Sequence, residues 1–520
     1  MARGAVAVRG LPGAVAGLVL AALMLGTLGV VLAHAGGMRL TGPDWAAVRF
    51  TLVQAALSAA ISVVLAVPVA RALARRRFAG RRLLIAALGA PFLMPVIVAV
   101  LGLLAIFGRG GVLNAGLAAV GLPPVQVYGL HGVVLAHVFL NLPLAVRMVL
   151  QGWQAIPAER FRTAAALGFG PAEVARHLER PMLREVLPGA ALAVFLICLA
   201  SFAAALILGG GPRATTVEVA IYQAVRFEFD LSRAAALAAV QFALCAGAVL
   251  LAARVAVPAG FGGGLDRAVQ RWDAGRWGLR LLDGAVIALA AAFLFAPLLA
   301  VILRGLPGLA ALPAPVWAAA GRSVVMALVS AALVLAGALA LGQLAVRGGV
   351  AGRLAELAGM LPLAASSLVL GAGLFIAVLP FAAPETVALP VTVLVNAAMA
   401  LPFALRLILP ALREVEATQM RLAESLGIGG WARLRLVTLP RLRRPLGFAG
   451  GVAAALAMGD LGVIALFAGE GNATLPMQVW RLMGAFRTEA AEAAAVLLLA
   501  ASFGLFWVMD RGGGRDDAGA

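Results

Sequence analysis

Long apolar runs, separated by short segments that carry most of the charge, dominate this chain of 520 residues. Hydrophobic residues make up 63% of the sequence and charged residues only 12%, which is unlike a soluble domain. The runs are about 20 residues long, enough for a helix to cross the hydrocarbon core of a bilayer. Because lipid offers no hydrogen-bond partners, each run must satisfy its own backbone, and a helix does so. The sequence therefore predicts an all-α polytopic membrane protein.

We place twelve membrane-spanning helices along the chain. They are expected near 13–34, 50–71, 83–107, 128–150, 187–209, 233–256, 279–304, 322–346, 354–380, 388–411, 446–468 and 490–509. This series divides into two tandem six-helix repeats. The first repeat is expected at 1–256, a linker at 257–278 and the second repeat at 279–520.

Landmark residues that recur at a fixed offset of 259 residues indicate a duplication. Gly168 and Pro181 correspond in this way to Gly427 and Pro440. The same offset pairs Pro143 with Pro402, Arg147 with Arg406, Arg184 with Arg443 and Thr215 with Thr474. Chance matching in Ala- and Leu-rich sequence explains paired alanines but not paired Pro, Arg and Gly, so we infer a tandem repeat. Each copy carries one polar segment between its fourth and fifth spans.

The distribution of arginine predicts the orientation of the spans. All 41 basic residues are Arg, and ten of them fall in one set of alternate loops, against 31 elsewhere. Positively charged loops stay in the cytoplasm, so both termini, the linker and both repeated polar segments are expected there. The net charge of +18 also suits an anionic lipid bilayer. Nucleic-acid binding is the rival reading, and we do not expect it because the arginines are dispersed between spans.

The N-terminal run admits a second interpretation. Arg3 and Arg9 precede an apolar stretch that ends in Ala33, His34 and Ala35, a pattern that resembles a cleavable signal peptide. The stretch is nearer in length to a full span, and the second repeat begins with a similar helix. We therefore expect a retained helix.

Residues that could carry chemistry are sparse. Cys198 and Cys245 fall in the middle of spans, where cysteine serves as a small apolar filler. The four histidines are scattered, and the sequence holds no Walker A, dinucleotide-binding or HExxH motif. We expect no cofactor, no metal site and no catalytic residue. The chain is accordingly predicted not to be an enzyme.

The two repeated polar segments form the candidate functional centre. In each, helical sequence leads to a glycine, then to a short amphipathic stretch (169–180 or 428–439), then to a proline. A short surface helix that docks into a groove on another protein has this pattern. Glycine permits a backbone reversal, and proline would end the short helix or start the next. An ordinary hairpin is the alternative, but duplication argues against it. The site residues are Ala164, Ala165, Gly168, Pro181, Ala423, Gly427 and Pro440.

This spacing resembles the EAA motif of ABC-importer permeases, with the consensus E-A-A-x3-G-x9-I-x-L-P. The second copy ends in Val437-Thr438-Leu439-Pro440 and fits well, whereas the first copy departs at Arg180. Both copies also depart at the leading acid, where Arg162 and Arg421 replace Glu. The resemblance implies a coupling helix that sits in a cleft of a cytoplasmic ATPase subunit.

Three further stretches, 135–143, 201–223 and 459–467, resemble the thiamine and thiamine pyrophosphate permeases, as does the fusion of two six-helix units. The resemblance implies a type I ABC importer permease with transmembrane cores at about 48–254 and 319–509. It also implies a bacterial inner membrane, two copies of an ABC ATPase and a periplasmic thiamine-binding protein. Thiamine or its phosphate esters would be the substrate. A ferric-iron permease and, less so, a secondary transporter are the alternatives.

Asp460 is an acid inside a predicted span, and the 259-residue offset pairs it with Ser201. Acids within spans are costly and usually face a cavity or a partner. Because thiamine is cationic, a carboxylate beside its path would suit it, as part of the pathway or a gate. The structural alternative is that Gly459 and Asp460 mark a broken helix whose freed amide the carboxylate caps.

Overall fold

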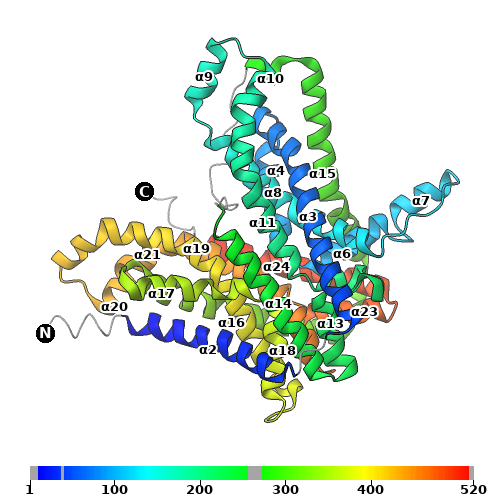
Figure 1. Ribbon diagram of the computed structural model, residues 1–520, viewed down its shortest axis with the longest axis vertical. Helices are drawn as coiled ribbons and strands as arrows, with labels where there is room; N and C mark the ends of the chain where they lie inside the picture. The colour runs from blue at the N-terminus through cyan, green and yellow to red at the C-terminus, as the bar shows by residue number, and fades with distance from the viewer. Residues whose placement is uncertain (1–9, 37–39, 256–271, 514–520) are drawn as a thin grey trace.

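The computed structural model describes residues 10–36, 40–255 and 272–513 (Figure 1). Most of the predicted linker 257–278 lies outside these residues. Over the described ranges the secondary structure is helical, and eleven helices are long and apolar enough to cross a membrane. A twelfth is counted if the pair Gly349–Ala364 and Ser367–Val378, bent by 91°, forms one span. The predicted all-α polytopic fold is confirmed.

The first half of the chain, up to residue 255, contains helices α2 to α14. Their bounds are α2 Leu11–His34, α3 Gly42–Arg75, α4 Arg81–Ala87, α5 Ala90–Leu93, α6 Val96–Phe107, α7 Val112–Ala119, α8 Leu130–Ala155, α9 Ala158–Ala166, α10 Pro171–Val174, α11 Arg180–Leu199, α12 Ala203–Leu208, α13 Val217–Gln223 and α14 Leu231–Ala252. Two π-helical turns lie between them, η1 at Ala175–Glu179 and η3 at Ala224–Glu228.

The second half, from residue 272, contains helices α15 to α24. Their bounds are α15 Trp277–Gly305, α16 Ala314–Val346, α17 Gly349–Met360, α18 Ser367–Val378, α19 Ala388–Ser425, α20 Gly430–Arg433, α21 Leu439–Met458, α22 Gly462–Phe467, α23 Leu475–Gly484 and α24 Thr488–Gly513. A π-helical turn, η8, spans Leu434–Thr438. Helices α10, η1, α11 and α12 have the same lengths as α20, η8, α21 and α22, and both of their ends are displaced by the 259 residues seen in the sequence.

The first long helix of each half packs against the other half. Helix α2 contacts α16, α17 and α18, whereas α15 contacts α3 and α6. Glycine allows the close approaches: a Cβ at Gly13 would lie 2.5 Å from the carbonyl oxygen of Ala340 in α16. A Cβ at Gly102 in α6 would lie 2.6 Å from the carbonyl oxygen of Pro297 in α15. The two halves are therefore interlocked.

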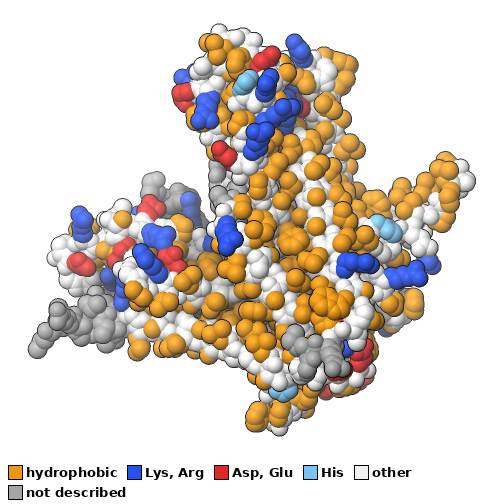
Figure 2. Space-filling view, viewed as in Figure 1, with side chains coloured by type: hydrophobic (Ala, Val, Ile, Leu, Met, Phe, Trp, Pro, Cys, Tyr) orange, Lys and Arg blue, Asp and Glu red, His pale blue; other side chains and the backbone are white. Residues whose placement is uncertain are grey.

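The remaining helices form two diverging arms (Figure 1). The first arm carries α9 and α10 at its tip, above the ends of α3 and α8 and beside the upper end of α15. The second arm carries α20 at its tip, beside α17, α19 and α21. Apolar side chains cover the sides of the molecule, whereas Arg, Asp and Glu gather at the arm tips, with an open notch between the arms on this face (Figure 2). Such a distribution suits apolar sides in lipid and charged tips in water.

Candidate functional site

The two repeated polar segments lie at the tips of separate arms, so the structure does not bring them together (Figure 1). We call residues 167–181 the first motif loop and residues 426–440 the second motif loop. Gly168 and Gly427 both have φ of +69°, a conformation that favours glycine. Each therefore supplies the chain reversal that the sequence predicts at this position.

The reversal closes with the same hydrogen bonds in both loops. The N–H of Gly168 donates to Ala165 (3.0 Å) and that of Phe169 to Ala164 (2.9 Å). In the second loop the N–H of Gly427 donates to Glu424 (3.1 Å) and that of Ile428 to Ala423 (2.8 Å). These two bonds define a Schellman motif, which ends a helix at a left-handed residue. The motif alanines thus provide carbonyl acceptors as well as close packing.

After the reversal, the chain forms one continuous helical segment in each half rather than a separate surface helix. In the first loop α10 runs into η1 and then α11, so that Pro181 lies in the first turn of α11. In the second loop α20 runs into η8 and then α21, with Pro440 in the same place. Proline removes one backbone donor and crowds the preceding turn, and the wider π-turn before it accommodates both effects. Of the two predicted roles for proline, the structure shows the second, in which it starts the next helix, and the expected short helix is continuous with that helix.

Each motif loop is anchored by buried side chains and presents apolar ones to the outside. Ala164, Val174 and Ala423 are buried. By contrast, Leu167 and Leu426 are each 65% exposed at the tips. The exposed set in the second loop also includes Trp431 and Leu436. Exposed apolar side chains at a charged arm tip are typical of a protein–protein contact surface.

Ion pairs connect each motif loop to the membrane-spanning helices beneath it. Glu179 in η1 pairs with Arg71 near the end of α3 at 2.9 Å. In the second half Arg433 in α20 pairs with Glu416 in α19 at 2.8 Å. Each motif loop is therefore joined to a long helix by a charged contact as well as by the backbone.

A further charged contact clamps α15 to the first arm. Asp283 of α15 accepts from Arg75 (2.5 Å) and Arg76 (2.7 Å) at the end of α3. Arg75 and Asp283 are almost fully buried. The sequence indicated only a cluster of arginines at the end of α3. Nothing in the sequence around Asp283, in the second half, predicted that it would pair with them. Arg75 and Asp283 lie 208 residues apart in the sequence, which explains why sequence analysis missed this contact.

Ser201 and Asp460 both lie where a long helix breaks into a short one. Ser201 follows α11 and precedes α12, while Asp460 follows α21 and precedes α22. Nε2 of His137 in α8 lies 2.7 Å from the Oγ of Ser201, and Nδ1 of the same ring lies 3.4 Å from the Oγ of Ser58. His137, which the sequence left without a role, thus bridges α3, α8 and the helix break.

Asp460 makes a different set of contacts. The backbone N–H groups of Gly462, Val463 and Ile464, at the start of α22, are the groups that approach its carboxylate, which is the place a capping side chain would occupy. Its Oδ2 is buried without a hydrogen-bond partner. A Cβ at neighbouring Gly459 would lie 3.1 Å from Pro95, so this break touches the first half. The carboxylate combines a capping contact with one free acceptor at the contact between the halves.

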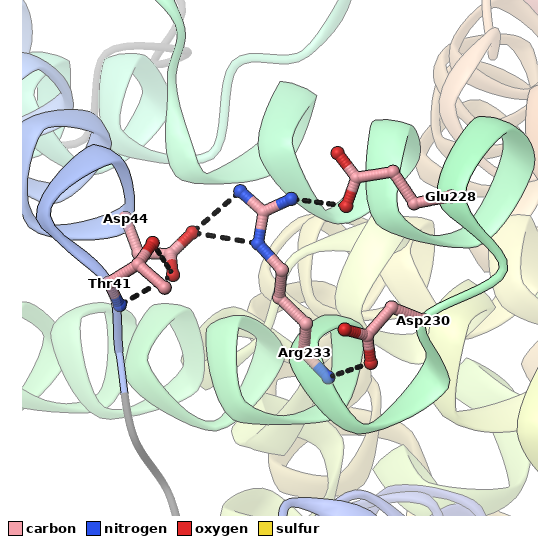
Figure 3. Close-up of polar contacts among 5 residues, drawn as sticks. All are labelled: Thr41, Asp44, Glu228, Asp230 and Arg233. Carbon is pink, nitrogen blue, oxygen red and sulfur yellow. Dashed lines mark hydrogen bonds and ion pairs between the residues drawn. The ribbon is translucent and has the colours of Figure 1, made fainter.

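A polar cluster joins the start of α3 to the start of α14 (Figure 3). Arg233 at the start of α14 donates to Asp44 of α3 from Nη2 (2.7 Å) and Nε (3.0 Å), and it also pairs with Glu228. Asp44 in turn accepts from the backbone and hydroxyl of Thr41 at 2.8 and 2.6 Å. Asp230 caps α14 through the N–H of Arg233 at 2.9 Å. This cluster fixes α3 against α14 where both helices begin.

The fold, with many candidate spans and two equivalent motif loops on separate arms, is that of a polytopic membrane protein. No family model matches the chain. The thiamine transport system permease protein ThiP of Escherichia coli (strain K12) is 40% identical over 489 residues, covering 91% of this chain and 90% of the relative. ThiP of Brucella abortus (strain 2308) is 39% identical over 474 residues, covering 90% and 87%. ThiP of Haemophilus influenzae is 33% identical over 470 residues, covering 87% and 86%.

The chain therefore belongs to the family of thiamine transport system permeases. The predicted family is confirmed by these relatives, and they lend no support to the ferric-iron alternative. The relatives are named as permeases, so the family is one of transport subunits.

Proposed function

We propose that this chain forms the path by which thiamine or its phosphate esters cross a bacterial inner membrane. The observation that carries the proposal is the near-full-length likeness to thiamine permeases, combined with two motif loops of the same geometry. The chain itself changes no covalent bond. The energy for transport enters through a separate ATPase.

The motif loops dock onto two copies of a cytoplasmic ABC ATPase. Support for this comes from the exposed Leu167, Leu426 and Trp431, which offer apolar contacts at charged arm tips. The arginine-rich side of the membrane, which holds both loops and both chain termini, is then the cytoplasm. A periplasmic thiamine-binding protein delivers the substrate to the opposite face.

The two arms and the two helix breaks provide a mechanism for transport. When the ATPase subunits close on ATP, they draw the two motif loops together and rock one arm against the other. The helix breaks at Ser201 and Asp460 line or gate the path between the halves. Access then alternates between two states whose balance ATP and the binding protein shift. The units that move are the two arms, in which α15 packs with the first arm and α2 with the second, so each predicted repeat, 1–256 or 279–520, lends its first long helix to the other.

Growth on trace thiamine tests the assignment of substrate. In a strain that can neither synthesise thiamine nor import it by another route, deletion of this chain should abolish growth on trace thiamine. High external thiamine should restore it. A plasmid copy of the chain should also restore it, and uptake of radiolabelled thiamine should follow the same pattern. Normal growth of the deletion strain on trace thiamine would overturn the proposal.

A further inference from the structure

Besides Asp460, the molecule buries a second acid that lies in the first half and takes no part in the motif loops or in the ion pairs. Glu218 is in α13, and its side chain is completely buried. Neither Oε1 nor Oε2 has a hydrogen-bond partner. Burying a carboxyl group without hydrogen bonds is costly, and such acids in membrane proteins mark functional sites.

Two glutamine side chains of the first half also leave their acceptors unused. Nε2 of Gln241 in α14 donates to the carbonyl of Leu199 at 2.9 Å, but its Oε1 is buried without a partner. Gln54 in α3 repeats this arrangement: its Nε2 donates to the carbonyl of Cys198 at 2.9 Å and its Oε1 is unpaired. Gln241 and Ser366 are the side chains that approach Glu218. Both can donate a hydrogen bond, but both are neutral, so among the described residues the acid has donors nearby and no cation beside it.

The wall that closes this place comes from the other half of the chain. Ser366 caps α18 by accepting from the N–H of Val369 at 3.1 Å. It lies at the break where the pair formed by α17 and α18 bends by 91°. Helix α18 also packs against α13 and α14. A movement that parts the two halves would draw α18 away from Glu218 and expose these acceptors between the halves, where transporters place their substrate sites.

The fold does not require an acid here. The corresponding stretch of α23 in the second half carries Pro476 and Met477, and the 259-residue offset pairs Gln241 with Ala500. The same short helix thus forms with apolar residues in the second half. The 259-residue offset therefore gives Glu218 and Gln241 no carboxyl or amide counterpart in the second half.

We propose that Glu218, assisted by the Oε1 of Gln241, binds the positively charged group of the substrate during translocation and makes the permease selective for a cation. This inference rests on the proposed function. The carboxylate gains a counter-charge when the cation arrives, and the amide oxygen accepts from a substrate N–H group. A bound cation offsets the cost of burying the carboxylate, so the free energy gained on binding is specific to a positively charged ligand.

Selectivity between a cation and its neutral isostere tests the proposal. The full complex of permease, ATPase and binding protein is reconstituted in vesicles, and ATP-driven uptake is measured for thiamine and for deazathiamine, whose neutral thiophene replaces the thiazolium. Glu218→Gln keeps the size of the side chain but removes its charge. We expect it to lower thiamine uptake by about tenfold to a hundredfold, the effect of one charge-assisted hydrogen bond. Uptake of deazathiamine should change little.

The control Glu489→Gln removes an exposed acid from the second half and should leave both uptake rates unchanged. If Glu218→Gln does not accumulate in the membrane, Glu218→Asp takes its place, and it should raise KM for thiamine but not for deazathiamine. Equal losses for both substrates, or no loss for either, would overturn the role of Glu218. Failure of the unmodified complex to take up thiamine would instead overturn the proposed function.

Discussion

Gly168 and Gly427 hold the backbone conformation on which each motif loop depends. Both have φ of +69°, and a Cβ at either position would meet no atom within 4 Å. Any effect of substitution is therefore due to backbone strain and not to a clash. An L residue in this conformation is disfavoured by about 1–2 kcal/mol, and a β-branched side chain by more.

Replacing both glycines with Val should uncouple the permease while leaving it in the membrane. We expect uptake of thiamine to fall by at least about tenfold, because a strain of this size shifts the loops out of their docking conformation. Copurification of the ATPase should fall with it. Gly247→Ala is the control, since Gly247 lies within α14 in open space and Ala favours helix. Unchanged uptake in the double Val variant would contradict the role of the loops.

Asp460 allows its two interpretations to be separated by substitution. Asp460→Asn retains an oxygen that can cap α22 but removes the charge, so we expect a normal protein level with a large loss of thiamine uptake. Asp460→Leu cannot accept a hydrogen bond from the N–H groups of Gly462 and its neighbours. We expect that variant to accumulate poorly, since an uncapped helix start is less stable by about 1 kcal/mol. Normal uptake by the Asn variant would leave capping as the only role.

At the scale of whole elements, the clamp between α3 and α15 is a nearly buried charged contact outside the motif loops. Asp283 accepts from two guanidinium groups in a nearly dry environment. Asp283→Asn should lower the thermal stability of the purified permease by an amount equivalent to about 3–5 kcal/mol, the usual effect of breaking a buried pair. Glu159→Gln removes an exposed pair with Arg162 and serves as the control, with an expected effect below about 1 kcal/mol. Equal melting temperatures for both variants would contradict the clamp.

The spans and the motif loops could be predicted because their causes are local. The length of the apolar runs and the positions of the arginines identify the spans. Gly168 indicates a chain reversal because glycine readily adopts a positive φ. The continuous path through Pro181 could not be predicted, because a π-turn that accommodates proline has no simple sequence pattern. Two ion pairs could not be predicted either, because each depends on how helices distant in sequence pack: Arg71 with Glu179, and Arg75 with Asp283. Glu218 was visible in the sequence, but its unpaired oxygens exist only in the fold.

At the scale of the whole molecule, the interlocked halves constrain how the arms can move. Helices α2 and α15 tie each half to the other, while the arm tips carry no such tie in Figure 1. We therefore expect the arms to approach each other when ATP closes the ATPase subunits. Spin labels attached at the exposed positions Ala172 and Ala432 would report the distance between the two arm tips by double electron–electron resonance. The distance should shorten with ATP in the full complex, and an unchanged distance would contradict the rocking motion.

The dependence of transport on the ATPase tests the central claim most directly. Vesicles that contain the permease are loaded with ATP and supplied with the thiamine-binding protein and radiolabelled thiamine outside. Three preparations of these vesicles are compared: one with the ATPase, one without it, and one with an ATPase variant that cannot hydrolyse ATP. The account predicts accumulation against the gradient only with the active ATPase, and background levels in the other two cases. Robust accumulation by the permease without any ATPase would contradict the account.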